Sequence, residues 1–597
     1  MVGSLLLPEA SLSDVLLAKP GVEIEDNLHI TVLREFTTEP IAPYLDFGLK
    51  EMGFSCSYTH SNYTLFPGDL EQEELWQNDP DFVIFAPDTH LLYGGAAGQS
   101  FAPTGEGFDG ALDAFIQNCI RVLSFARSKT SAPIFILFPL APYPFATGIA
   151  QHNDQGPLLA HHFAALRTAL EDEVASLGHV QVISLSEAFL FVGIQACLDR
   201  RRQFASLTPF TPVGYREIAL EILTRIRARC GKTKKVLVLD CDETIWGGVS
   251  GEGEQNVGLN PECYPDSAHL ELQAYAQHLS RSGVLVCLVS KNEPETVWNI
   301  FDHHDAMILT RDDIVGERIN WLNKSENLKS LADELNLNLD SFVFVDNSPA
   351  EIHEVCLSCP TVTTVLATED GLADLPGLIH RSGWFQKESI TETDSARAAL
   401  YKSEQVRKKH LHEAVDHDDF LRSLQMQGTL KSGGDVDVNR AAQMSQRTNQ
   451  FNLTTKRYDA ADMSEFVESP DHWVATLHIE DRFGVLGDVG LVIAWRTGDS
   501  VVVDTLLLSC RAFGRYCETI LLQSVLNWAQ GLGVKTLKGS YRPSAKNALV
   551  TGFWEKYGFH VETDGVGNQV AEVQLEKFSI VSTNVYKSID LTSWSEK

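Results

Sequence analysis

The sequence of 597 residues lacks the features that mark membrane-spanning and disulfide-stabilised proteins. It has no apolar run near the roughly 20 residues that a spanning helix needs, and its first residues lack the basic start of a secretory signal. Its 11 cysteines are few, odd in number and scattered, which favours reduced thiols over a disulfide framework. We therefore expect a cytoplasmic protein without a membrane partner.

Positive charge is also scarce, because 48 Lys and Arg face 80 Asp and Glu, for a net charge of -32. This acidity argues against nucleic acid and anionic membranes as partners. Residues 401–460 reverse the balance, with ten basic against eight acidic residues, and form either a docking surface for an acidic partner or a solvated helix face. The length fits three or four folded domains.

The most informative motif is Asp240-Cys241-Asp242-Glu243-Thr244, which follows the apolar run at 236–239. Two carboxylates and the Thr244 hydroxyl thus lie at the C-terminal end of a predicted strand, where open α/β sheets place their chemistry. Alternation along an extended chain directs Asp240 and Asp242 to one side, so that they can hold a hard cation and act on a phosphate ester. An isolated motif of this kind could equally be an acidic loop.

Three further groups follow in the order expected of a single site. Ser290 comes directly after the predicted strand at 284–289, and Lys324 precedes a helical pattern. Asp346 then follows the predicted strand at 341–345. The set as a whole favours a phosphoryl-transfer site over an acidic loop.

These residue types allow a specific mechanism. Asp240 attacks phosphorus, while Asp242 protonates the leaving oxygen and then activates water. Ser290 and Lys324 hold the phosphoryl oxygens, and Asp346 joins the two earlier carboxylates around Mg²⁺. The residues match the four motifs of the haloacid dehalogenase (HAD) superfamily of phosphotransferases. The resemblance implies a magnesium-dependent Rossmann-like domain, a catalytic hydroxyl at Thr244 and an aspartyl-phosphate intermediate.

Residues 1–228 are predicted to form a separate α/β domain, with strands at 30–33, 81–85, 134–138 and 180–185. The sequence from Thr208 to Tyr215 resembles the end of an SGNH-type esterase fold, which is flavodoxin-like in architecture. Ser206 and Pro209 stand where that family places an Asp and a His, and neither can act as a base. We expect a degenerate domain that serves dimerisation or partner docking.

The predicted strand at 501–508 runs into a turn that contains Cys510, Arg511, Gly514 and Arg515. Backbone amides at such a strand-to-helix turn can cradle phosphate. The turn resembles the pyrophosphate loop of GNAT acyltransferases, which implies that Arg511, Gly514 and Arg515 bind phosphopantetheine or coenzyme A. It departs from that pattern at Tyr516.

Cys510 has two interpretations. The neighbouring arginines and the following helix N-terminus favour a reactive thiolate. A strand cysteine pointing into the core is the alternative.

Together with the stretch from Gln446 to Thr455, these motifs resemble the FkbH-like family nearly end to end. The resemblance implies an enzyme of polyketide or related biosynthesis that removes phosphate from 1,3-bisphosphoglycerate. It then transfers a glyceryl group to the phosphopantetheine thiol of an acyl carrier protein. The implied multidomain α/β fold has an SGNH-like domain at 1–228, a HAD-like phosphatase at 229–376, a helical connector at 377–434 and a GNAT-like α+β domain at 435–597.

Two departures from the family pattern keep other functions open. Val289 stands where many members carry a thioester-forming cysteine, with Cys287 nearby, and Asn347 replaces a second acidic residue beside Asp346. Cys510 would have to carry any acyl group, and we expect weakened metal binding. The alternatives are a stand-alone Mg²⁺-dependent phosphatase or phosphotransferase with an accessory acyltransferase-like domain, and a non-catalytic docking scaffold.

Overall fold

The computed structural model describes residues 7–17, 24, 26–88, 106–140, 159–252, 256–387, 400–401, 407, 416–544, 546–579 and 584–590. The chain divides into an N-terminal unit, Leu5–Ile226 with Gly377–Gly383, and a C-terminal unit that comprises Arg227–Pro376 and Trp384–Lys597. Among the described residues, no helix is long and apolar enough to cross a membrane. Within the basic stretch at 401–460, residues 402–406 and 408–415 lie outside the described residues.

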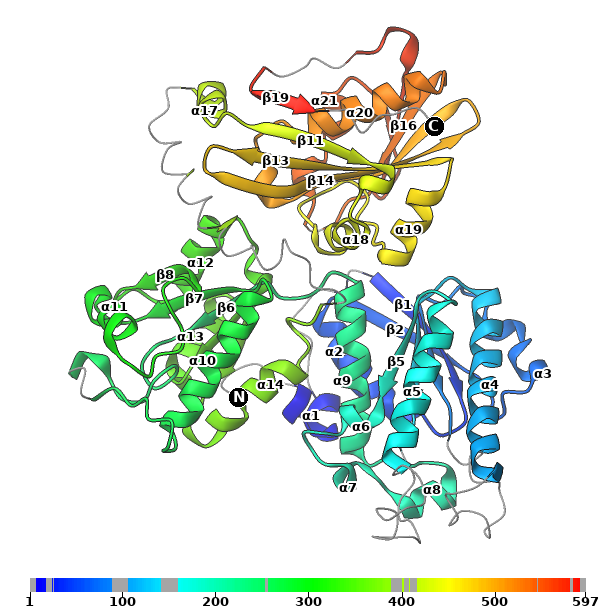
Figure 1. Ribbon diagram of the computed structural model, residues 1–597, viewed down its shortest axis with the longest axis vertical. Helices are drawn as coiled ribbons and strands as arrows, with labels where there is room; N and C mark the ends of the chain where they lie inside the picture. Colours follow the sequence, from blue (N-terminus) through cyan, green and yellow to red (C-terminus); the bar gives the residue numbers. More distant parts are fainter. Residues whose placement is uncertain are drawn as a thin grey trace. The chain divides into compact units, whose positions relative to one another are not determined.

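A parallel sheet forms the centre of the N-terminal unit (Figure 1). Its order is β2-β1-β3-β4-β5, with strands β1 (Asp26–Arg34), β2 (Phe54–His60), β3 (Phe82–Ala86), β4 (Ile134–Phe138) and β5 (Val180–Ser184). Every residue of β3 and β4 is buried, as expected for parallel strands covered on both faces.

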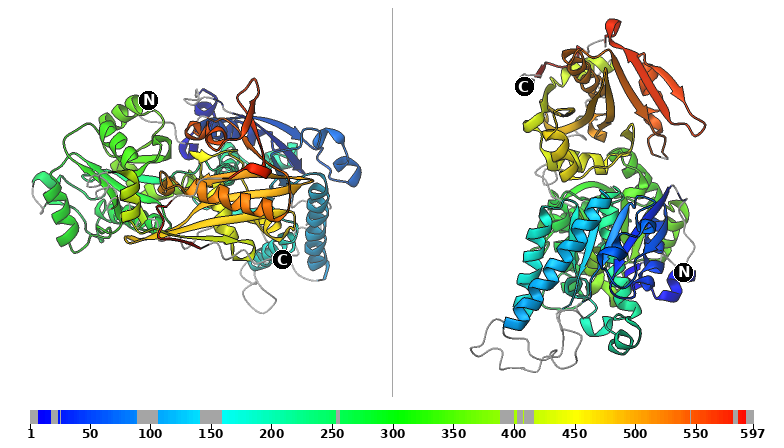
Figure 2. Two further views of the ribbon diagram at one scale, coloured as in Figure 1. Left: turned by 90° about the horizontal axis from the view of Figure 1, so that it is seen from above. Right: turned by 90° about the vertical axis from the view of Figure 1, so that its right-hand side faces the viewer.

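Two pairs of helices pack in this unit. Helices α4 (Glu106–Lys129) and α5 (Leu159–Ala175) run along one face of the sheet (Figure 2, right). Helices α2 (Ala42–Glu51) and α9 (Pro212–Arg229) approach so closely at Gly48 that a Cβ there would collide with Leu223.

The positions singled out by the SGNH resemblance make local hydrogen bonds. The Ser206 hydroxyl donates to the carbonyl of Arg202 at 3.1 Å, and the Pro209 carbonyl accepts the Asp199 N–H at 2.8 Å. The chain leaves β1 through Arg34 and Glu35, with no serine at the turn. These contacts hold the turn in place, and the absence of hydrolase activity stays a prediction.

The second sheet, in the C-terminal unit, is also parallel. Its order is β10-β9-β6-β7-β8, with strands β6 (Val236–Leu239), β7 (Leu285–Ser290), β8 (Ile314–Ile319), β9 (Phe342–Asp346) and β10 (Thr363–Leu366). The chain begins at the central strand β6, proceeds outward to β8 and returns to β9. Ligand sites of open α/β sheets form where the strand order reverses in this way, at the C-terminal edge.

Helices connect the strands of the second sheet. They are α10 (Asp266–Arg281), α11 (Pro294–His303), α12 (Lys324–Leu335) and α13 (Pro349–Ser358). Leu328, Leu331 and Leu335 of α12 are buried against the sheet, which confirms the helical pattern predicted from the sequence.

The third sheet is mostly antiparallel. Its order is β17-β18-β16-β15-β14-β13-β11-β19, and its strands are β11 (Gln427–Ser432), β13 (His472–Asp481), β14 (Gly484–Thr497), β15 (Ser500–Leu508), β16 (Thr536–Tyr541), β17 (His560–Thr563), β18 (Gln569–Gln574) and β19 (Ser588–Asp590). The short strand β12 (Phe451–Asn452) pairs with β15, and β15 and β16 are parallel neighbours.

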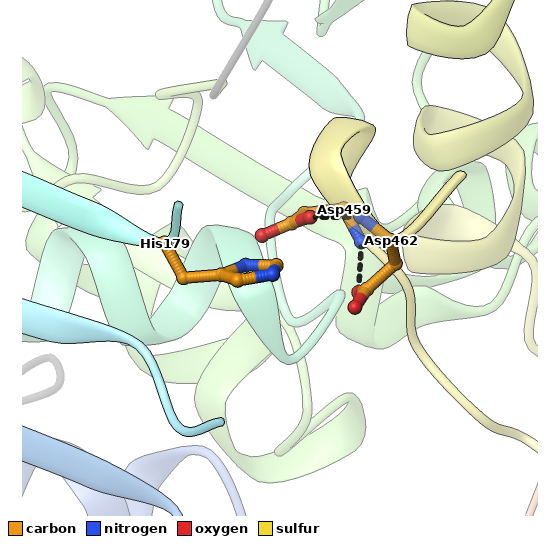
Figure 3. A group of neighbouring side chains, drawn as sticks. All are labelled: His179, Asp459 and Asp462. Carbon is orange, nitrogen blue, oxygen red and sulfur yellow. Dashed lines mark hydrogen bonds between the residues drawn. The ribbon is translucent and has the colours of Figure 1, made fainter. Parts of the chain in front are cut away.

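Three helices pack with the third sheet: α18 (Val438–Arg447), α19 (Ala460–Glu468) and α20 (Cys517–Gly531). Helix α19 begins with a capping box, in which Asp459 accepts the Asp462 N–H and the Asp462 carboxylate accepts the Asp459 N–H at 2.8 Å (dashed line in Figure 3). The sheets and helices confirm the predicted multidomain α/β fold class. The boundaries of the four predicted domains remain a prediction.

Candidate active site

Four residues singled out in the sequence meet at the C-terminal edge of the second sheet. Asp240 directly follows β6, Ser290 ends β7, Asp346 ends β9, and Lys324 is the first residue of α12. All four are buried. The three strands are neighbours in the sheet, so parallel pairing brings their last residues together.

Lys324 is the cation between two carboxylates. Its Nζ lies 2.5 Å from Asp240 Oδ1 and 3.2 Å from Asp346 Oδ2, and it also donates to the carbonyl of Val289 at 2.6 Å. Only 2% of the Lys324 side chain is exposed, so these contacts are made away from water. The ammonium therefore offsets the charge of two buried acids.

Burial and mutual repulsion shift the ionisation of this group. Burial raises the pKa of Asp240, and Lys324 opposes that shift. Burial and the neighbouring Asp240 charge raise the pKa of Asp346 to about 6, again against the effect of Lys324. Burial would lower the pKa of Lys324, but the two carboxylates outweigh it and the pKa is raised. The edge thus carries more negative charge than its single lysine balances.

The carboxylates fit a magnesium ion. Asp346 Oδ2 is buried and accepts no hydrogen bond from the described residues, although Lys324 lies within ion-pair distance. The buried Thr244 hydroxyl likewise has no hydrogen-bond partner among them. Mg²⁺ prefers carboxylate oxygens, so Asp240 and Asp346 offer suitable ligands.

Asp242 is held differently. Its Oδ1 accepts the Trp246 indole N–H at 2.8 Å and the Ser250 backbone N–H at 3.1 Å, and its Oδ2 accepts the Asn292 amide at 3.1 Å. The turn between Asp242 and Ser250 is tight, since Glu243 has a φ of 54° and its carboxylate accepts the Gly248 N–H. Three N–H donors therefore fix this carboxylate beside the buried group.

Sequence reasoning missed these three donors. Trp246 and Ser250 belong to the loop after the first motif, and Asn292 follows Ser290 by two residues. The signal in the sequence was that Trp246, Ser250 and Asn292 lie within a few residues of the motif positions. It does not reveal which backbone or side-chain group will face Asp242.

Cys287, the thiol nearest to Val289, lies inside β7 and is fully buried. Burial raises the pKa of its thiol to about 12. None of the eleven cysteines forms a disulfide in the structure. Cys287 is therefore unsuited to nucleophilic attack.

Cys510 lies at a second location, in the turn after β15. It is half-buried, and its Sγ lies 3.4 Å from the Tyr401 hydroxyl. Two cavities of about 90 Å³ and about 260 Å³ share Cys510, Tyr401, Arg511 and Phe513 in their walls. The thiol thus lines spaces that a small ligand could enter, and it is not a fully enclosed core cysteine.

Cationic side chains line both cavities. Arg440 and Arg447 border the smaller one, and Arg407, His417 and Arg515 border the larger one. Arginine is suited to phosphate and carboxylate because its N–H groups form a rigid fork. The smaller cavity, in which Asp340 is the single acidic lining residue, therefore favours anionic groups. The larger cavity does not show this preference, because Asp333 and Glu334 also line it and its Arg407 and Arg515 pair with Asp481.

The predicted phosphate-binding turn is tightly built. Arg515 Nε donates to the carbonyl of Arg511 at 2.9 Å, and His417 Nε2 donates to the carbonyl of Gly514 at 2.7 Å. Gly514 and Tyr516 have φ of 71° and 58°, in the left-handed region that favours glycine. At Tyr516, where the resemblance expects a small residue, the hydroxyl donates to Asp418 Oδ1 at 3.0 Å.

The chain fills the gap where β15 and β16 separate. The two strands pair only from Ser500 to Val503 on the β15 side, and β12 then pairs with the end of β15. Leu453 bridges both sides, because its N–H donates to the carbonyl of Leu506 and its carbonyl accepts the Arg542 N–H. The segment from Phe451 to Leu453 therefore lies between the separated ends of β15 and β16.

The two locations lie at opposite edges of the second sheet. Lys235 and Ser341 directly precede β6 and β9 and line the smaller cavity with Cys510, whereas Asp240 and Asp346 stand at the other ends of these strands. Strands rise about 3.3 Å per residue, so roughly 13–17 Å of sheet separates the two locations. The structure does not bring Cys510 together with the Asp240 group.

Comparisons with known proteins show a likeness of fold over part of the chain. No protein-family model matches the sequence. No curated protein matches it either. Among solved structures, the N-terminal part of the protein BF1531 from Bacteroides fragilis is 20% identical, with a TM-score of 0.55. That structure is described as containing a phosphatase domain complexed with Mg, and the match covers 65% of this chain and all of that one. The two chains share a fold over this part.

Acetyltransferases give weaker likenesses. The PaiA N-acetyltransferase from Thermoplasma acidophilum, solved in complex with coenzyme A, is 16% identical over 19% of this chain and 70% of that chain, with a TM-score of 0.16. The ribosomal-protein-S18-alanine N-acetyltransferase from Escherichia coli is 15% identical over 27% of this chain and 99% of that chain, with a TM-score of 0.20. TM-scores this low support no inference about this chain.

Proposed function

We propose that the chain is a Mg²⁺-dependent HAD-type phosphatase that also transfers an acyl group. In this proposal it takes 1,3-bisphosphoglycerate and loads glyceryl onto the phosphopantetheine thiol of an acyl carrier protein. The observation that carries it is the buried group in which Lys324 contacts Asp240 and Asp346 beside Ser290. The Mg-bound phosphatase domain described for the Bacteroides fragilis protein supports it.

Phosphate ester hydrolysis proceeds in two steps. A carboxylate oxygen of Asp240 attacks phosphorus, and the bond from phosphorus to the leaving oxygen breaks while Asp242 gives that oxygen a proton. Asp242 then takes a proton from water, whose oxygen attacks the phosphorus of the aspartyl-phosphate. Inorganic phosphate leaves and the Asp240 carboxylate is restored.

The surrounding residues supply charge and position. Ser290 and Lys324 hold the phosphoryl oxygens. The catalytic role of the Thr244 hydroxyl, which is buried without a hydrogen-bond partner among the described residues, is carried over from the sequence motif. Asp240 and Asp346 would hold Mg²⁺, which would neutralise charge that develops on the phosphoryl group. The Asp242 carboxylate, predicted as a third ligand, is instead taken by three N–H donors. Lys324 supplies a compact charge at the same place.

Acyl transfer uses the second location. The Cys510 sulfur attacks the acyl-phosphate carbonyl, so that a C–S bond forms, the C–O bond to phosphate breaks and phosphate leaves. The phosphopantetheine thiol then attacks the thioester, and its proton passes to the Cys510 sulfur. Arg511, Gly514 and Arg515 would bind the phosphopantetheine phosphate. The remaining phosphate ester is hydrolysed at Asp240, so both phosphates of the substrate are released.

A stand-alone phosphatase with an accessory acyltransferase-like domain is the second candidate. Two observations favour it. Val289 provides no thiol beside Ser290, and Cys510 lies at the other edge of the sheet from Asp240. Under this function, phosphate is released without any acyl group on a protein.

Intact mass spectrometry separates the two candidates. A phosphopantetheinylated carrier protein is incubated with the enzyme, Mg²⁺ and enzymatically generated 1,3-bisphosphoglycerate, using wild type, Asp240→Asn and Cys510→Ala. A glyceryl adduct in wild type, a phosphoglyceryl adduct with Asp240→Asn and no adduct with Cys510→Ala support the coupled reaction. Free phosphate with an unmodified carrier in wild type supports the stand-alone phosphatase.

A further inference from the structure

Asn292 connects two residues of the candidate active site through one side chain. Its Nδ2 donates to Asp242 Oδ2 at 3.1 Å and to Ser290 Oγ at 3.2 Å, and its Oδ1 accepts the Ser250 hydroxyl at 3.1 Å. The residue is 4% exposed, so water does not compete for these contacts. A single buried amide thus links the phosphate-binding serine, the acid–base carboxylate and the loop after the first motif.

The contacts determine which way the amide faces. An amide oxygen only accepts and an amide nitrogen only donates. Because the Asp242 carboxylate only accepts, Nδ2 must face Asp242 and Ser290, and Oδ1 then accepts the Ser250 hydroxyl. Ser250 therefore acts on the carboxylate in two ways, directly through its backbone N–H and indirectly by orienting Asn292.

The two oxygens of Asp242 are not equivalent. Oδ1 accepts two N–H groups, from Trp246 and from Ser250, whereas Oδ2 accepts one, from Asn292. A carboxylate oxygen has two lone-pair sites, so Oδ1 is filled and Oδ2 keeps one site for a proton. The oxygen that can carry the proton is the one held by Asn292.

We propose that Asn292 is a positioning residue that aims Asp242 Oδ2 at the leaving oxygen, an inference that rests on the phosphatase function proposed above. The proton moves from Oδ2 to the leaving oxygen as the bond from that oxygen to phosphorus breaks. Asn292 touches neither reacting atom. It holds Asp242 Oδ2, the donor oxygen, in place. Through its bond to Ser290, it also fixes the position of Oδ2 relative to the bound phosphoryl group.

This role makes the effect of Asn292 depend on the leaving group. p-Nitrophenolate is a weak base that departs without a proton, whereas phenolate is a stronger base and gains from proton donation in the transition state. Phenyl phosphate and p-nitrophenyl phosphate differ only by the nitro group. They bind the same phosphoryl-holding residues, so a fault in phosphate binding affects both alike.

The test is single-turnover release of the two phenols, with enzyme and Mg²⁺ in excess, for wild type and Asn292→Ala. General acid catalysis contributes about 10²–10⁴-fold, and misplacing the acid forfeits part of it. We expect Asn292→Ala to slow phenyl phosphate roughly 10–100-fold and p-nitrophenyl phosphate less than about threefold. An equal loss on both substrates, or no loss on either, overturns the proposal.

Two more variants make the test independent of how well Asn292→Ala folds. Ser250→Ala removes the hydroxyl that orients the amide but keeps the backbone N–H, so it should show the same selective loss at smaller size. Combined with Asn292→Ala it should add nothing further on phenyl phosphate. Full additivity overturns the proposed coupling.

Gln277→Ala serves as a matched deletion of a partly buried amide in the same region. Gln277 donates to the Ile308 carbonyl and to Asp313, away from the site. We expect this variant to affect the two substrates equally. A selective loss like that of Asn292→Ala would overturn the proposal. Failure of wild type to hydrolyse either ester would instead overturn the phosphatase function itself.

Discussion

Replacing Lys324 with methionine should lower the free energy of unfolding, because Lys324 offsets the charge of two buried carboxylates at the edge of the second sheet. Methionine fills a similar volume but carries no charge, so Asp240 and Asp346 are left buried without their cation. The lysine lies 2.5 Å from one carboxylate and 3.2 Å from the other, and its side chain is only 2% exposed. Removing one partner of a buried ion pair costs about 3–5 kcal/mol. We expect a loss of this size in the free energy of unfolding at pH 7.5 without Mg²⁺.

The same substitution at Lys291 is the control. Lys291 lies 2.6 Å from Glu351, but the two side chains are 34% and 21% exposed. Exposed ion pairs contribute about 0–1 kcal/mol, so Lys291→Met should cost no more than about 1 kcal/mol. Both variants lose one lysine near the site, but Lys324 makes two buried ion pairs whereas Lys291 makes one that is partly exposed.

Urea unfolding followed by tryptophan fluorescence measures the difference, since Trp246 is fully buried in this part of the chain. Mg²⁺ should restore much of the stability of Lys324→Met, because it supplies the missing positive charge. Acid should also help. The pKa of Asp346 is raised to about 6 in the fold, so its repulsion acts above that pH and is relieved as the pH falls toward 4. Equal losses for Lys324→Met and Lys291→Met, or no response to Mg²⁺, would refute the reasoning.

Metal binding and the third sheet give three further expectations. Mg²⁺ competes with a proton at Asp346, whose pKa is about 6. Calorimetry should therefore show the Mg²⁺ affinity falling by up to tenfold per pH unit below pH 6. A constant Mg²⁺ affinity down to pH 5 would contradict this. Asn347→Asp adds a carboxylate next to Asp346 and should tighten Mg²⁺ binding, whereas unchanged affinity would show that the neutral residue does not weaken the site. Arg407→Met leaves the buried Asp481 carboxylate without its bidentate partner. Urea titrations should show a loss of about 3–5 kcal/mol in the free energy of unfolding. A loss under about 1 kcal/mol would overturn this conclusion.

Buried strands could be predicted from the sequence because their residues are continuously apolar. The run at 236–239 coincides with β6, and the strand at 501–508 matches β15 to within one residue. The helix expected after the turn that contains Cys510 is α20, which begins at Cys517. Strands β2, β8 and β10 were missed. They lie at the edges of their sheets and carry polar, partly exposed residues, so they give no continuous apolar run.

Motif order predicted which carboxylates would meet, but not how they would be held. Parallel strands end at a common edge, so Asp240, Ser290 and Asp346 had to lie together once their strands were neighbours. The donors to Asp242 depend on the turn at Glu243, whose left-handed backbone has no signature in the sequence. The position of Cys510 depends on which edge of the second sheet faces the turn after β15. Packing between sheets leaves no periodic pattern to read.

The position of Cys510 determines what a reaction that couples acyl transfer to phosphate removal requires. About 13–17 Å of sheet separates Asp240 from the cavities beside Cys510, whereas a glyceryl thioester on a cysteine extends only a few ångströms from the backbone. A group bound to Cys510 therefore cannot reach Asp240 while it stays attached there. Coupling needs either a free intermediate or a flexible arm that visits both edges. Phosphopantetheine is such an arm, so a carrier protein would take part in the phosphatase step as well as accept the acyl group. The short loop after Asp242 would leave that route open from the C-terminal edge, because it is too small to form a large cap.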